Sequence, residues 1–139
     1  MNQTITTPNS ALNISSDGAD PILIYVDGAG CRPDGKGSGF AWIHPSSGEQ
    51  HIEQIDGLTN NQAEYRALIS ALVALPNGSS AQIFTDSQVM WSQVIGKYRV
   101  HHPELADLLL QVRTTIKQKS LNIDLKWVPR NRNLAGKLL

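Results

Sequence analysis

The stretch Ile-Leu-Ile-Tyr-Val-Asp-Gly-Ala-Gly, residues 22–30, decides the fold of this chain. Its first five residues are apolar, and the run then ends at an aspartate followed by glycine. A strand with one solvent-exposed face would alternate apolar and polar residues, so this run predicts a strand that is buried on both faces. Asp27 therefore stands where a central strand ends, and its carboxylate must be stabilised there by a cluster of donors or by a metal ion.

The chain has 139 residues, which is enough for one domain with a buried core. We expect residues 1–20, which are rich in serine, threonine and asparagine, to be a disordered leader and residues 21–139 to form the domain. No apolar run is long enough to span a membrane, and the first residues lack the basic and apolar regions of a signal peptide. The single cysteine, Cys31, excludes an internal disulfide and fits a reducing compartment, so a cytoplasmic location is expected.

The net charge of zero conceals an asymmetry along the chain. Residues 1–86 contain three basic and nine acidic side chains, whereas residues 87–139 contain nine basic and three acidic ones. An acidic half beside a basic half suits a site that holds divalent cations next to a surface that binds phosphates. Two solvated surfaces of opposite sign would give the same pattern, so charge alone leaves both interpretations open.

Apolar patterns and turn residues predict the remaining elements. The Pro-Ser-Ser-Gly segment at 45–48 predicts a hairpin turn, and Thr59 with Gln62 has the spacing of a capping box at a helix start. The predicted strands are residues 22–27, 40–44, 51–55, 81–85 and 121–128, and the predicted helices are residues 60–75, 88–95 and 103–116. Because the later strands follow crossovers, they should lie parallel to the first. The expected fold class is α/β, with a mixed five-stranded sheet, the order βββαβααβα and helices on both faces.

Three carboxylates should meet at one edge of this sheet. Asp27 ends the first strand and Asp86 ends the fourth, and parallel neighbours place these ends side by side. Glu64 lies on the apolar stripe of its helix, since Leu68 and Ala71 follow it at helical spacing. Taken singly, Asp27 could be a turn residue, Glu64 a capping-box side chain and Asp86 an N-cap. The convergence of the three acids favours one shared role. Converging carboxylates repel each other, and all-oxygen ligation favours Mg²⁺ or Mn²⁺.

Four segments carry a resemblance to a known family. They are Tyr-Val-Asp-Gly at 25–28, Thr-Asn-Asn-Gln-Ala-Glu-Tyr at 59–65, Thr-Asp-Ser-Gln at 85–88 and Trp-Val-Pro-Arg at 127–130. In order and spacing they resemble the successive motifs of the type 1 ribonuclease H family, over residues 22–139. Residues 96–103 resemble the short-linker branch of that family, which lacks the basic protrusion of longer members.

The resemblance implies an enzyme, a hybrid-specific endoribonuclease that hydrolyses the RNA strand of RNA–DNA hybrids and leaves 5′-phosphate and 3′-hydroxyl ends. It implies two Mg²⁺ or Mn²⁺ ions, bridged by Asp27, with Glu64 and Asp86 completing the metal sites. The positions that match hybrid contacts are Gly28, Gly30, Cys31, Asn60, Asn61, Gln62, Ser87 and Gln88. For Cys31 the alternative is an inert small side chain. Arg130 or Arg132 is a candidate contact to the scissile phosphate, and a plain surface role is the alternative. The expected partner is the RNA–DNA hybrid, and we expect a monomer with no membrane contact and no obligatory protein partner.

The chain departs from the family at its fourth acidic position. The family has aspartate after an alanine at the start of its last helix, whereas Gly136 follows Ala135 here. The amide of Asn133, one helical turn earlier, is the candidate replacement ligand and is favoured over Asn131. An amide is a neutral and weaker ligand, so we expect weaker binding of one metal ion. The alternative for Asn133 is a helix cap, and the alternatives for the protein are a non-catalytic hybrid-binding module and a DNA-directed nuclease.

Overall fold

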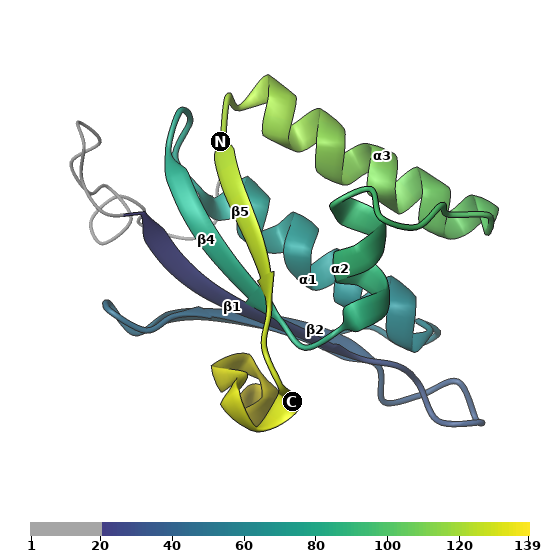
Figure 1. Ribbon diagram of the computed structural model, residues 1–139. Helices are drawn as coiled ribbons and strands as arrows, with labels where there is room; N and C mark the ends of the chain where they lie inside the picture. Colours follow the sequence, from purple (N-terminus) through teal and green to yellow (C-terminus); the bar gives the residue numbers. More distant parts are fainter. Residues whose placement is uncertain (1–20) are drawn as a thin grey trace.

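The computed structural model describes residues 21–139, so the predicted leader at residues 1–20 lies outside the described residues. Five strands form one mixed sheet in the order β3-β2-β1-β4-β5 (Figure 1). They are β1 (Ile22–Ala29), β2 (Gly39–His44), β3 (Glu49–Gln54), β4 (Ser80–Thr85) and β5 (Asn122–Trp127). β2 is antiparallel to β1 and β3, while β4 is parallel to β1 and β5 is parallel to β4. The predicted mixed sheet is confirmed, and β1 is its central strand.

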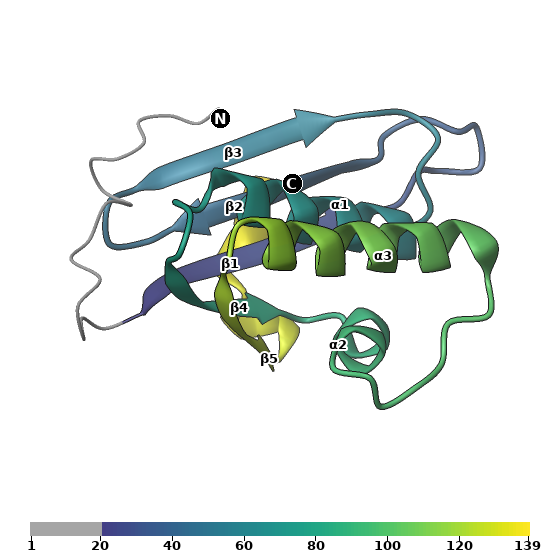
Figure 2. The same ribbon diagram turned by 90° about the horizontal axis from the view of Figure 1, so that it is seen from above.

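Three α-helices cover one face of the sheet (Figures 1 and 2). They are α1 (Asn60–Ala74), α2 (Gln88–Val94) and α3 (Pro103–Gln118). α1 packs directly on β1 and β2, and α3 packs on α1. No helix in the described part of the chain is both long and apolar enough to cross a membrane.

The opposite face of the sheet carries a short 3₁₀ helix, η2 (Leu134–Leu138), which packs on β1 and β2 (Figure 1). A second 3₁₀ helix, η1 (Arg130–Arg132), connects β5 to η2. The expected final α-helix is therefore wrong. The Gly136 N–H donates to the Asn133 carbonyl three residues back, at 3.1 Å, as in a 3₁₀ turn. Five residues that include a glycine are too few to stabilise an α-helix.

The two faces of β1 are not equally buried. Ile22, Ile24 and Val26 pack toward the helices and are buried, whereas Leu23 on the other side is 38% exposed. The expected burial on both faces is wrong for the first half of the strand, because η2 is too short to cover it. Asp27, near the end of the strand that η2 does cover, is fully buried.

The start of α1 explains how a helix residue reaches the end of β1. The predicted capping box is confirmed, because the Thr59 side chain accepts a hydrogen bond from the Gln62 N–H at 3.1 Å and the Gln62 side chain accepts one from the Thr59 N–H at 2.9 Å. Gly28 lies against the following turn, where a Cβ atom would be 2.3 Å from the Ala63 carbonyl carbon. Glycine permits this close approach. The approach places Glu64 beside the end of β1.

Candidate active site

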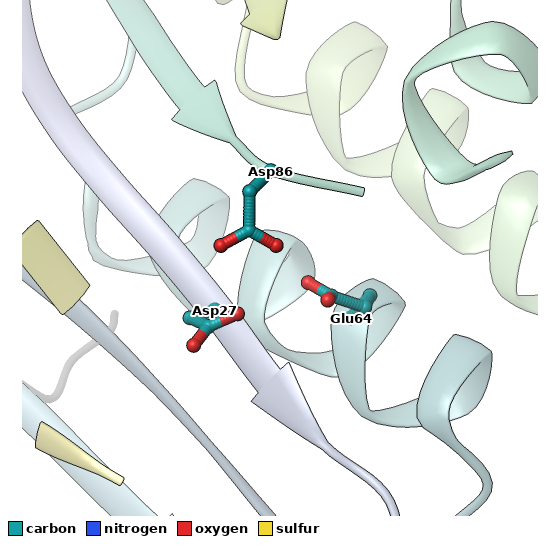
Figure 3. A group of neighbouring side chains, drawn as sticks. All are labelled: Asp27, Glu64 and Asp86. Atoms are coloured by element: carbon teal, nitrogen blue, oxygen red, sulfur yellow. The ribbon is translucent and has the colours of Figure 1, made fainter. Parts of the chain in front are cut away.

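The three predicted carboxylates lie together at one edge of the sheet (Figure 3). Asp27 comes from β1, Asp86 from the residue after β4, and Glu64 from the first turns of α1. One oxygen atom from each carboxylate lies within 4.8 Å of the corresponding atoms of the other two. The structure therefore brings together the side chains that the strand ends and the helix face predict.

Three oxygen atoms of these buried carboxylates lack hydrogen-bond partners in the part of the chain that the structure describes. Asp27 is fully buried, Glu64 is 7% exposed, and the side chain of Asp86 is 7% exposed. Both carboxylate oxygens of Asp27 and Oε1 of Glu64 make no hydrogen bond within the described residues. Burying an ionised carboxylate without a partner is unfavourable, and a divalent cation with oxygen ligands would supply the partner. The residues present therefore fit a Mg²⁺ or Mn²⁺ site.

Burial and mutual repulsion change the protonation of two of these acids. Burial raises the pKa of Asp27 to about 6, the Asp86 charge adds to the rise, and the nearby Arg130 opposes it. Burial, together with the charges of Asp27 and Asp86, raises the pKa of Glu64 to about 9. In the metal-free protein Glu64 therefore carries a proton at neutral pH, and this proton must leave when a cation binds.

We expect the stabilisation of the protein by Mg²⁺ to increase with pH. A folded-state pKa above the unfolded value contributes stability at low pH, and this contribution is lost as the pH rises through about 6 for Asp27 and about 9 for Glu64. Because a cation binds the ionised carboxylates, its binding offsets this loss of stability, which grows as the pH rises. The check is the increase in melting temperature on adding Mg²⁺, which should be larger at pH 9 than at pH 6. An equal increase at both pH values would contradict this linkage.

The predicted fourth ligand, Asn133, does not turn its oxygen toward the carboxylates. Its side-chain oxygen accepts a hydrogen bond from the Ala135 N–H at 3.0 Å and thereby caps η2. Its amide nitrogen donates to Asp86 Oδ2 at 3.0 Å and to the Val26 carbonyl at 2.8 Å. The reverse orientation would place the oxygen against two acceptors. The hydrogen bonds therefore agree with the capping alternative and differ from the ligand interpretation.

Gly136, at which the resemblance predicts a fourth acidic side chain, lies next to Asp27. A Cβ atom at this residue would be 3.4 Å from Asp27 Oδ2, which is ordinary van der Waals contact. A longer side chain at position 136 would therefore reach the site. Glycine leaves the site with three carboxylates and no fourth acid from η2.

An open cleft leads to the carboxylates, and most of the predicted hybrid contacts line it. The predicted residues that line the cleft are Gly28, Asn60, Asn61, Ser87, Gln88 and Arg130. Gly30 and Cys31 follow β1, and the Gly30 N–H donates to Asn60 Oδ1 at 2.7 Å. Because this bond uses the oxygen of Asn60, its amide N–H groups are available to a ligand.

Two predicted contacts have structural roles as well. Ser87 caps α2 by accepting a hydrogen bond from the Met90 N–H at 3.1 Å. The oxygen of the Gln62 side chain belongs to the capping box of α1, and this residue lines a separate groove between α1 and α3. Gln62 is therefore outside the cleft that holds the carboxylates.

Two apolar residues of the cleft, Val89 and Trp127, were missed as site residues by the sequence reasoning. The Trp127 indole N–H donates to the Asp86 carbonyl oxygen at 3.1 Å, which fixes the backbone that carries this acid. A signal for Trp127 was present, because it ends β5, the parallel neighbour of β4. Parallel neighbours end at the same edge of a sheet.

Comparisons with known proteins agree with this fold. The sequence model of the RNase H family matches residues 19–135. The chain is 31% identical over 119 residues to the bifunctional protein Rv2228c of Mycobacterium tuberculosis, a match that covers 81% of this chain and 32% of that protein. The chain thus spans about a third of the length of this relative.

The solved structures with a similar fold include two proteins described as RNase H1. The fold is similar to that of RNase H1 from the halophilic archaeon Halobacterium salinarum, with a TM-score of 0.72, 27% identity, and coverage of 86% of this chain and 94% of that one. It is also similar to LC11-RNase H1, solved in complex with an RNA/DNA hybrid, with a TM-score of 0.69, 26% identity, and coverage of 85% and 92%.

Proposed function

Because this chain belongs to the RNase H family, we propose that it hydrolyses the RNA strand of RNA–DNA hybrids and leaves 5′-phosphate and 3′-hydroxyl ends. The observation that carries the proposal is the cluster of the carboxylates of Asp27, Glu64 and Asp86. Glu64 and Asp86 line an open cleft. The similarity to LC11-RNase H1, which was solved with a hybrid, supports the choice of substrate.

The carboxylates of Asp27, Glu64 and Asp86 would hold two divalent ions, Mg²⁺ or Mn²⁺. When bound, such ions supply an activated water and stabilise charge on the leaving oxygen. The protein's own residues keep the ligands in place. Trp127 donates to the backbone carbonyl of Asp86 and Asn133 donates to its carboxylate, so both its backbone and its side chain are held.

Side chains of the cleft would bind the hybrid through its backbone and 2′-hydroxyl groups. Within residues 21–139 the amide N–H groups of Asn60 donate no hydrogen bond, while its oxygen accepts one from the Gly30 N–H. Such groups can contact sugars in the shallow groove without reading the base sequence. Arg130 would contact the scissile phosphate. Because contacts to phosphates release counterions, hybrid binding is expected to weaken steeply with salt.

A cleavage assay tests the proposed activity. The labelled RNA strand of an RNA–DNA hybrid should be cut when Mg²⁺ or Mn²⁺ is added, and it should remain intact when a chelator removes the ions. A DNA duplex of the same sequence is the matched control, because it lacks the 2′-hydroxyl groups, and it should remain uncut. A gel shift with the hybrid but no cleavage with either ion would favour a non-catalytic binding module. Cutting of the DNA duplex would contradict hybrid specificity.

We also propose that the domain acts in the cytoplasm as a monomer, with no obligatory protein partner. The three carboxylates of the proposed metal site lie within 4.8 Å of one another in a single chain. Sedimentation velocity should show one species with the chain mass of 15.2 kDa.

A further inference from the structure

The side chain of Arg130 lies close to two of the three carboxylates, those of Asp27 and Asp86. Its Nη1 atom lies 3.5 Å from Asp86 Oδ2 and 3.8 Å from Asp27 Oδ1, so one guanidinium group bridges two acids of the site. Within residues 21–139, no other basic side chain forms an ion pair with Asp27, Glu64 or Asp86. When no metal ion is bound, the guanidinium group is therefore the positive charge that lies next to these acids.

We propose that Arg130 is an internal counter-cation that bridges Asp27 and Asp86 in the metal-free protein and must move away before a divalent ion can bind between them. This inference rests on the proposed metal site. The guanidinium group faces oxygens that an ion would need, and its charge would repel the ion. Arg130 therefore lowers the affinity of the site for a cation relative to the carboxylates alone.

The contacts of Arg130 allow such a movement. Its side chain is 70% exposed, and its distances to the two acids are those of an ion pair without a hydrogen bond. Asn133 provides the contrast, because it is 4% exposed and its amide donates to the same Asp86 Oδ2 at 3.0 Å. Asp86 Oδ2 thus contacts both a buried neutral donor and an exposed cation. Once released, Arg130 is free to contact a phosphate of the hybrid.

Calorimetric titration of the intact chain with Mg²⁺ and with Mn²⁺, without nucleic acid, tests the role of Arg130. Arg130→Gln should bind the first ion about tenfold more tightly than the parent, because it removes a positive charge close to the ion. Arg132→Gln is the matched control, because it removes the same charge from an exposed residue of the same short helix that makes no ion pair among the described residues. Its affinity should stay within about twofold of the parent value. Arg130→Lys, which keeps the charge, should also stay close to the parent.

The possible results separate this inference from the proposed function. If Arg130→Gln binds no more tightly than Arg132→Gln, the counter-cation role is wrong while the metal site stands. If Arg130→Lys binds as tightly as Arg130→Gln, charge is not the cause and the inference also fails. If neither the parent nor any variant binds Mg²⁺ or Mn²⁺, the proposed metal centre is wrong, and this inference falls with it.

Discussion

Replacing Asp27 with asparagine is expected to reduce hybrid cleavage by a factor of about a thousand or more. Asp27 is the fully buried acid of the site, and both of its oxygens lack hydrogen-bond partners. A neutral amide keeps the shape of the side chain but removes the charge that would bind the ions. Because the buried carboxylate is itself unfavourable above its raised pKa of about 6, the metal-free variant should be at least as stable as the parent at pH 8.

Single-turnover cleavage, cation titration and thermal unfolding together check the role of Asp27. Asp124→Asn is the matched control, because it removes the same charge from an exposed side chain of the edge strand β5. The control should cleave and bind Mg²⁺ like the parent. Cleavage by Asp27→Asn at the parental rate would show that the reaction does not depend on this carboxylate.

The sheet edge that carries the acids was predictable because local patterns determine it. The apolar run before Asp27 predicts a central strand, and β1 is the central strand of the sheet. The spacing of Thr59 and Gln62 predicts the start of α1, because a capping box uses only residues within one turn. The meeting of Asp27 with Asp86 follows from parallel pairing of the strands that precede them.

The segment after β5 could not be predicted in the same way, because its contacts are between residues far apart in the chain. The Asn133 amide is oriented by the Val26 carbonyl, which is 107 residues away. The sequence places Asn133 near the site, but it does not say whether oxygen or nitrogen faces the acids. In the same way, the guanidinium group of Arg130 forms ion pairs with Asp27 of β1 and with Asp86, which follows β4. No local spacing in the sequence predicts these contacts.

Replacing Asn133 with aspartate is expected to destabilise the metal-free protein by about 3 kcal/mol or more. Aspartate has nearly the same size and can still accept the Ala135 N–H, so the cap of η2 is retained. The loss comes from the other end of the side chain, where an amide that donates to Val26 and Asp86 becomes an oxygen facing two acceptors. Chemical denaturation with a chelator present, compared with the parent, measures this loss.

Gly136→Asp is the control that separates an added charge from a lost donor. It also adds one carboxylate near Asp27, since a Cβ atom at position 136 would lie 3.4 Å from Asp27 Oδ2, but it leaves the hydrogen bonds of Asn133 intact. We expect a smaller loss without metal, about 1 kcal/mol, and tighter Mg²⁺ binding because a fourth acidic ligand is present. For Asn133→Asp we expect the loss of stability without a comparable gain in affinity. If Asn133→Asp instead keeps its stability and binds Mg²⁺ more tightly than the parent, the side chain at 133 is a ligand position after all, and the orientation of its amide does not govern the site.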